Sequence, residues 1–185
     1  MQARPTGQIT SRVLRRSDTL PSLQLTDVNG ETVNTRGFYG KRNLVLFFVG
    51  SLRRDACRGL LRALAERHDE IRGEESEVIA IVPGAREEAR KAVDEMRLPF
   101  RVLVDTDGEA HRRVGAAGED GGPVAAVLVV DRFDEVYEAR YESEGHRLMD
   151  ADAVVRSLRF IQVQCPECGA PEWPVIEEPV ARRQT

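Results

Sequence analysis

Along most of the chain, short apolar segments alternate with segments in which apolar residues recur every three or four positions. Residues 20–33 alternate apolar and polar side chains around an Asn29-Gly30 pair, which is typical of a β-hairpin. The continuous apolar run at residues 44–49 is too short for a helix and predicts a strand buried on both faces. From Asp55 onward the apolar spacing becomes helical, with Asp55 as the expected N-cap. A hairpin, a central strand and a helix are therefore expected in this order.

The same alternation continues through most of the remaining chain. It predicts strands at residues 77–82, 100–104, 124–130 and 135–141, helices at residues 85–96 and near 110–114, and a last helix that starts near Asp150 or Asp152. This order favours an α/β fold of three layers, with a mixed central sheet, helices on both faces and an N-terminal β-hairpin. Chemistry in such sheets usually sits at the carboxyl ends of strands, and Cys57 follows the predicted central strand.

The length of 185 residues allows one domain with a sizeable core and an appendage. Residues 1–18 are polar and basic and are interpreted as a flexible lead-in. Residues 19–162 contain the alternating pattern and form the predicted domain. Residues 163–185 are expected to be a C-terminal tail that carries a CPEC element.

Charge and hydropathy narrow the class of protein. Lys and Arg total 27 against 31 Asp and Glu, and the sequence has no block of five like charges that would indicate a nucleic-acid partner. The longest apolar run is far below the ~20 residues of a membrane span, and the N-terminal residues lack the apolar segment of a secretory signal. A cytoplasmic protein without a membrane partner is therefore expected.

The chain has three cysteines, Cys57, Cys165 and Cys168, and this odd number does not fit a disulfide scaffold. Reactive or metal-binding thiols are the alternative. Cys57 falls in the first turn of a predicted helix, where the positive end of the helix dipole favours a thiolate. The neighbouring cations, which would stabilise that thiolate further, are Arg53, Arg54 and Arg58. The competing interpretation is that Cys57 lies on the apolar face of this helix and is a small buried side chain.

The CPEC element at residues 165–168 has two chemical interpretations and one structural one. As a redox pair, Cys165 and Cys168 would resolve an oxidised Cys57 and then form a disulfide with each other. As a metal element, Cys165 and Cys168 would hold zinc, with further ligands from a dimer partner or from His146. The structural interpretation is a turn with idle thiols. Apart from this zinc alternative, the three histidines, His68, His111 and His146, stand among charged residues and are expected to be solvated.

Three blocks of sequence resemble the thioredoxin-fold redoxins, and most closely the peroxiredoxin branch, also called the alkyl hydroperoxide reductase and thiol-specific antioxidant group. The first is LPSLQLTDVNGETVNTRGFYGKRNLVLFF, and the later ones are FRVLVDTDGEAHRRVG and VLVVDRFDEV. The resemblance covers roughly residues 20–161. It implies a thioredoxin-like fold, and it places Cys57 where peroxiredoxins hold their peroxide-reacting cysteine.

Three positions depart from the peroxiredoxin pattern. Gly50 stands where the family has Pro, Arg54 stands where it has Thr or Ser, and Ala125 stands where it has an active-site Arg. The hydroxyl and the guanidinium of that pattern stabilise the reacting oxygens. Arg53, Arg54 and Arg58 are the candidates to replace the missing guanidinium.

The sequence thus predicts a thiol-dependent oxidoreductase that reduces a peroxide or a protein disulfide through Cys57, with Cys165 and Cys168 as the resolving pair. The resemblance implies a thiol reductant such as a thioredoxin and no cofactor, and it leaves a homodimer open. The alternative is a non-catalytic module for binding or assembly, in which the CPEC element holds zinc or forms a dimer contact.

Overall fold

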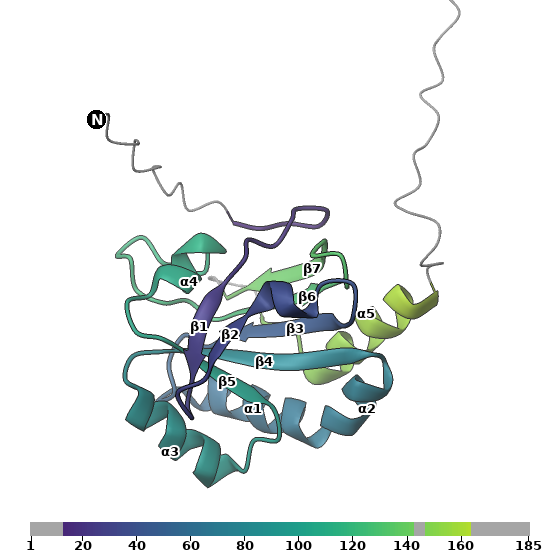
Figure 1. The fold of residues 1–185 in the computed structure, drawn as a ribbon. Helices are drawn as coiled ribbons and strands as arrows, with labels where there is room; N and C mark the ends of the chain where they lie inside the picture. Colours follow the sequence, from purple (N-terminus) through teal and green to yellow (C-terminus); the bar gives the residue numbers. More distant parts are fainter. Residues whose placement is uncertain (1–12, 143–146, 164–185) are drawn as a thin grey trace, which may run out of the picture.

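The computed structural model describes residues 13–142 and 147–163, and within them seven strands form one mixed sheet (Figure 1). The strand order across the sheet is β2-β1-β5-β4-β3-β6-β7. β3, β4 and β5 are parallel, whereas the other neighbouring pairs are antiparallel. The strands are β1 (Gln24–Asp27), β2 (Thr32–Asn34), β3 (Asn43–Phe48), β4 (Ser76–Pro83), β5 (Arg101–Asp105), β6 (Ala126–Val130) and β7 (Val136–Tyr141).

The central position of β3 follows from its composition. All six of its residues, NLVLFF, are buried, so both faces of the strand need cover. β3 pairs in parallel with β4 from Asn43↔Ser76 to Phe48↔Ile81, and antiparallel with β6 on its other side. Because β3, β4 and β5 run in the same direction, their carboxyl ends lie at one edge of the sheet. The chain leaves β3 at this edge and enters the helix that carries Cys57.

More helices cover one face of the sheet than the other. Figure 1 shows α1, α3 and α5 gathered on one side of the sheet, while α4 and the segment before β1 lie on the other. On the first side, Leu61, Leu64 and Ile71 are among the fully buried side chains. The helices are α1 (Asp55–Glu66), α2 (His68–Gly73), α3 (Arg86–Met96), α4 (Glu109–Arg113) and α5 (Ala151–Val163), with one turn of 3-10 helix, η1 (Thr35–Phe38).

The opposite face of the sheet is covered mainly by irregular chain. Leu14, Leu20 and Leu23 pack there against the inner residues of β3 and β6, together with Val114 after α4. The phenolic oxygen of Tyr141 ties this cover to the sheet, because it donates to the carbonyl of Val114 at 2.7 Å and accepts from the N–H of Leu14 at 3.1 Å. Three layers result, as the sequence predicts. The division of the chain at residues 18/19 and 162/163 stays a prediction.

The predicted hairpin, central strand and β-α-β alternation are confirmed. The hairpin begins at Gln24 rather than at residue 20, and the other element ends differ by one or two residues. The Asn29-Gly30 turn joins β1 to β2, and Gly30 adopts a φ of 95°, which favours glycine. The N-cap of α1 is Arg54, and Asp55 is the first helical residue, so the assignment of Asp55 as the cap is wrong. α2 and η1 were not predicted.

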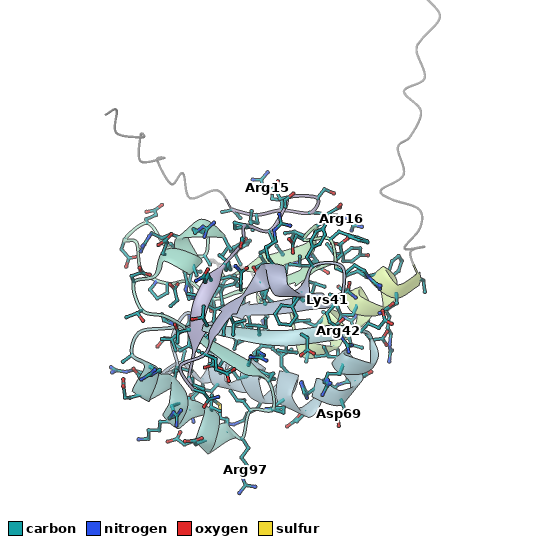
Figure 2. The ribbon with its side chains drawn as sticks, viewed as in Figure 1. Arg15, Arg16, Lys41, Arg42, Asp69 and Arg97 are labelled. Atoms are coloured by element: carbon teal, nitrogen blue, oxygen red, sulfur yellow. The ribbon has the colours of Figure 1, made fainter. Side chains whose placement is uncertain are left out.

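The surface carries charges of both signs. Figure 2 shows Lys41, Arg42 and Asp69 on the outside of the molecule, where water solvates their charges. The expected solvation of two histidines is wrong, because His68 and His111 are 9% and 1% exposed. Among residues 13–142 and 147–163, no helix is long and apolar enough to span a bilayer.

Candidate active site

Cys57 is the third residue of α1 and lies just beyond the carboxyl end of β3. Its position in the first turn confirms the prediction from helical spacing. The side chain is 0% exposed and packs in the same apolar cluster as Leu60, Leu61 and Leu64. The thiol therefore combines a place at the positive end of a helix dipole with complete burial. A reactant can reach it only when the surrounding chain opens.

Residues 50–54 form most of the loop between β3 and α1, and this loop closely approaches the backbone just before β6. A Cβ atom at Gly50 would lie 2.9 Å from the backbone nitrogen of Ala125 and 3.4 Å from its Cβ. Contacts below 3.0 Å are essentially never seen for real Cβ atoms, so this packing requires glycine. Two of the positions that depart from the peroxiredoxin pattern are thus direct neighbours in space.

The third departing position joins the same cluster. The guanidinium of Arg54 forms a bidentate ion pair with the carboxylate of Glu142, and the N–H of Glu142 donates to the carbonyl of Ala125 at 2.8 Å. The hydrogen bond and the charge of Glu142 raise the pKa of Arg54, and the charge of Cys57 adds a smaller contribution in the same direction. Arg54, the N-cap of α1, is three residues before Cys57 at the same helix end, but a carboxylate already holds its guanidinium.

The other two predicted cations face α3. Nε of Arg53 lies 3.9 Å from a carboxylate oxygen of Glu88, and Nη2 of Arg58 lies 3.2 Å from one of Glu95. The Arg53 side chain is 88% exposed, so its ion pair is weak. Both arginines line a surface cleft of about 350 Å³ beside Leu52. Of the three predicted cations, Arg54 is thus the one paired with a carboxylate from the β6-β7 hairpin, whereas Arg53 and Arg58 pair with α3.

A second polar group lies at the carboxyl edge of the sheet. Nδ1 of His111, on α4, is 2.6 Å from Oδ2 of Asp105 at the end of β5, and Nε2 is 3.2 Å from the carbonyl oxygen of Val49. Burial alone would raise the pKa of Asp105, but the hydrogen bonds from His111 and from the backbone N–H groups of Ala110 and His111 outweigh it and lower that pKa.

Sequence reasoning missed Glu142, Asp105 and His111 as neighbours of the loop that leads to Cys57. Glu142 carries no local signal, since it is 88 residues from Arg54 and reaches it through the β6-β7 hairpin. Asp105 does carry one, because it ends a parallel strand at the edge where chemistry is expected. His111 follows six residues later in α4, and its own backbone N–H and that of Ala110 donate to the Asp105 carboxylate.

Cys165, Cys168 and His146 lie outside the described residues. No group of three or more His, Cys, Asp or Glu side chains in the described part of the chain is arranged to hold a metal ion. The chain approaches residue 164 from the far edge of the sheet, since the amide of Gln162 near the end of α5 donates to the carbonyl of Glu74, just before β4 begins. Cys57 is at the opposite, carboxyl edge.

The fold and the helix-terminal thiol define this molecule as a thioredoxin-fold redoxin. Comparison with known proteins is consistent with this class. The AhpC/TSA family pattern matches residues 17–139. Peroxiredoxin Bcp from Escherichia coli (strain K12) is 28% identical over 106 residues, which are 57% of this chain and 67% of that protein. The chain belongs to the AhpC/TSA family, and it is a thiol-dependent oxidoreductase of the peroxiredoxin-like group.

Solved structures share the fold. Peroxidoxin BcpB from Mycobacterium tuberculosis superposes with a TM-score of 0.72 at 21% identity, covering 80% of this chain and 98% of that one. AhpC from Mycobacterium tuberculosis superposes with a TM-score of 0.71 at 18% identity, covering 84% of this chain and 98% of that one. The thioredoxin-like fold predicted from the sequence is thereby confirmed.

Proposed function

We propose that Cys57 is the thiol that attacks a peroxide, and that Cys165 and Cys168 resolve the product. The observation that carries this proposal is the position of Cys57 in the first turn of α1, at the carboxyl end of β3 and beside Arg54. The helix dipole and a nearby cation both stabilise a thiolate, which is the nucleophilic form of cysteine. This chemistry uses the protein's own sulfur atoms and needs no resident cofactor.

Oxidation proceeds in three steps, and reduction by a partner completes the cycle. The Cys57 thiolate attacks one peroxide oxygen, the O–O bond breaks, and the leaving oxygen takes a proton, which gives Cys57 sulfenic acid and an alcohol or water. A thiol of the CPEC element then attacks the sulfenic sulfur, and water leaves as a disulfide with Cys57 forms. The second CPEC thiol displaces Cys57 and leaves a Cys165–Cys168 disulfide. A dithiol reductant such as a thioredoxin reduces that disulfide to two thiols and is itself oxidised to a disulfide.

Arg54 is the residue we assign to the role of the missing family guanidinium. It is connected to the position of that guanidinium, Ala125, through Glu142. A cation there stabilises both the thiolate and the negative charge that develops on the peroxide oxygens. Opening of the Arg54–Glu142 pair is required for the guanidinium to turn to the substrate. The same opening would loosen the loop that precedes the buried thiol.

The geometry restricts how the resolving thiols reach Cys57. The six residues of β3 span about 20 Å between the two edges of the sheet. From the end of α5 at Val163, Cys165 can extend at most ~7 Å and Cys168 about 17 Å. A disulfide adds about 5.5 Å between Cα atoms, so the reach of Cys165 falls short of the opposite edge whereas that of Cys168 just spans it. Resolution within one chain would therefore fall to Cys168, whereas a second copy could offer either thiol, and we propose the second copy.

The test is the reaction of the reduced protein with one equivalent of hydrogen peroxide, followed by intact mass and peptide mapping. The wild type should lose two hydrogens, whereas Cys57→Ser should consume no peroxide. The matched control, Cys165→Ser with Cys168→Ser, should stop at a sulfenic acid on Cys57. Unchanged peroxide consumption by Cys57→Ser would refute the assignment.

Mixing the two variants locates the resolving thiols. A chain with Cys57→Ser retains the CPEC pair, and the double variant retains Cys57, so an inter-chain disulfide forms only if one copy resolves the other. Because the second CPEC thiol then displaces Cys57, resolution by a second copy should leave a Cys165–Cys168 disulfide in the Cys57→Ser chain and a reduced Cys57 in the double variant, and the masses of the two chains show both. A double variant that stays at the sulfenic acid, with normal oxidation of the wild type, would assign resolution to the same chain.

A further inference from the structure

The reaction steps above leave one buried charged pair without a role. The His111 side chain is 1% exposed, and the Asp105 side chain is fully buried. The pair joins α4 to the carboxyl end of β5, and its second ring nitrogen reaches Val49, the residue directly after β3. Phe48 packs edge-on against the imidazole, with ring centroids 5.3 Å apart. The pair therefore connects two parallel strands at the edge where Cys57 lies.

The donor count of this arrangement fixes the hydrogens on the ring. The carbonyl oxygen of Val49 can only accept a hydrogen bond, so Nε2 must carry a hydrogen. The Asp105 carboxylate also accepts the backbone N–H groups of Ala110 and His111, at 3.1 and 2.9 Å. An ionised carboxylate has no hydrogen to donate, so a hydrogen bond to Asp105 places a hydrogen on Nδ1 as well. An imidazolium, whose charge the carboxylate balances, is the form of the ring that satisfies both acceptors.

The Val49 carbonyl is the last fixed point before the loop of residues 50–54. The bonds within that loop have similar lengths but join neutral donors to neutral acceptors: the N–H of Arg54 donates to the carbonyl of Ser51 at 3.3 Å, and the N–H of Arg53 donates to the hydroxyl of Ser51 at 3.2 Å. A hydrogen bond from a charged donor is about twice as strong as one between neutral groups. The anchor at Val49 is therefore a restraint on the loop that leads into α1.

We propose that His111 is a positioning residue: its buried imidazolium, held by Asp105, fixes the Val49 carbonyl and keeps the loop of residues 50–54 closed ahead of Cys57. This inference deepens the proposed function, since it takes Cys57 as the reacting thiol. The state of the ring and the restraint on the loop are nevertheless measurable without any peroxide. Failure of the peroxide reaction and failure of this inference are therefore separate results.

The first measurement is the nitrogen-15 NMR spectrum of the His111 ring in the full-length wild type at neutral pH. Both ring nitrogens should show the shifts of protonated nitrogens, each coupled to a hydrogen. A ring with one bare nitrogen would overturn the proposal. This measurement needs no variant, so it decides the question even if a substitution at His111 prevents folding.

The second measurement compares His111→Gln with the wild type. Amide hydrogen exchange at residues 51–54 and alkylation of Cys57 by iodoacetamide should both become about tenfold to a hundredfold faster, the factor expected for one lost charge-assisted hydrogen bond. His68→Gln is the matched control, because His68 is also a buried histidine. It lies at the start of α2, and its ring packs near Phe100. It should leave both rates unchanged. Loop exchange and alkylation at wild-type rates in a folded His111→Gln protein would overturn the proposal.

Discussion

Replacing Gly50 with alanine should destabilise the protein because the added methyl group has no room. The ideal Cβ position lies 2.9 Å from the backbone nitrogen of Ala125 and 3.4 Å from the carbonyl carbon of Val124. Both are main-chain atoms just before β6 (Ala126–Val130), the strand that pairs with β3 along five residues. Such atoms cannot rotate away as the end of a flexible side chain can. The clash must shift the loop or the strand.

The size of the effect follows from two opposing contributions. Overpacking of this kind costs about 1–3 kcal/mol, whereas replacing a loop glycine lowers the entropy of the unfolded chain and returns about 0.4–1 kcal/mol. The net loss of unfolding free energy is about 1–2 kcal/mol. For a chain of this size it lowers the melting temperature by about 2–8 °C. Gly50→Pro, which restores the residue of the family pattern, carries the same Cβ and should destabilise the protein as well.

Chemical denaturation followed by circular dichroism measures this difference, with Gly59→Ala as the control. Gly59 lies in α1 with no atom within 4 Å of its added Cβ. Alanine there should stabilise the helix by about 0.5–1 kcal/mol. If Gly50→Ala proves as stable as the wild type, the close approach of the loop to β6 is not a restraint, and the reasoning fails.

Two further predictions concern charged and ionisable groups beside the site. Glu142→Gln frees Arg54 from its carboxylate partner, so Cys57 should react faster with iodoacetamide. The loss of this partly exposed ion pair should cost at most ~1 kcal/mol of unfolding free energy. An unchanged alkylation rate would show that Arg54 does not act on the thiol. Burial raises the pKa of Tyr141 to about 12, against about 10 in the unfolded chain, so the unfolded state loses its proton first. Unfolding free energy should therefore fall as the pH rises from about 10 to 12, and less steeply in Tyr141→Phe; equal slopes would contradict the shift.

The elements that the sequence predicts well are those whose signal is local. β3 is recognisable because its residues form a continuous apolar run, which a strand buried on both faces needs. The start of α1 is recognisable because apolar residues recur at helical spacing. Cys57 illustrates the limit, since its place in the first turn is predictable but its complete burial depends on helices and strands far along the chain. Both sequence interpretations of this thiol, a helix-terminal nucleophile and a buried side chain, describe part of the same geometry.

The sequence does not reveal the burial of His111 or the Arg54–Glu142 pair, because both depend on how distant segments pack. His111 stands among charged residues in the sequence, but adjacent positions on a helix point in different directions, so Ala110 and His111 are buried while Arg112 is not. The Arg54–Glu142 pair depends on how the β6-β7 hairpin returns to the site, and no periodicity encodes that path. Charge pairs formed across the fold are therefore where sequence reasoning ends.

The complete burial of the Cys57 sulfur has a kinetic consequence. An oxidant meets the thiol only during the fraction of time that the covering segment is open, so at low oxidant concentration the observed second-order rate is the intrinsic rate multiplied by that fraction. At high concentration every opening event is productive, and the rate levels off at the frequency of opening. The protein would then show saturation with peroxide without forming a stable complex with it, and its plateau would report a motion of the chain.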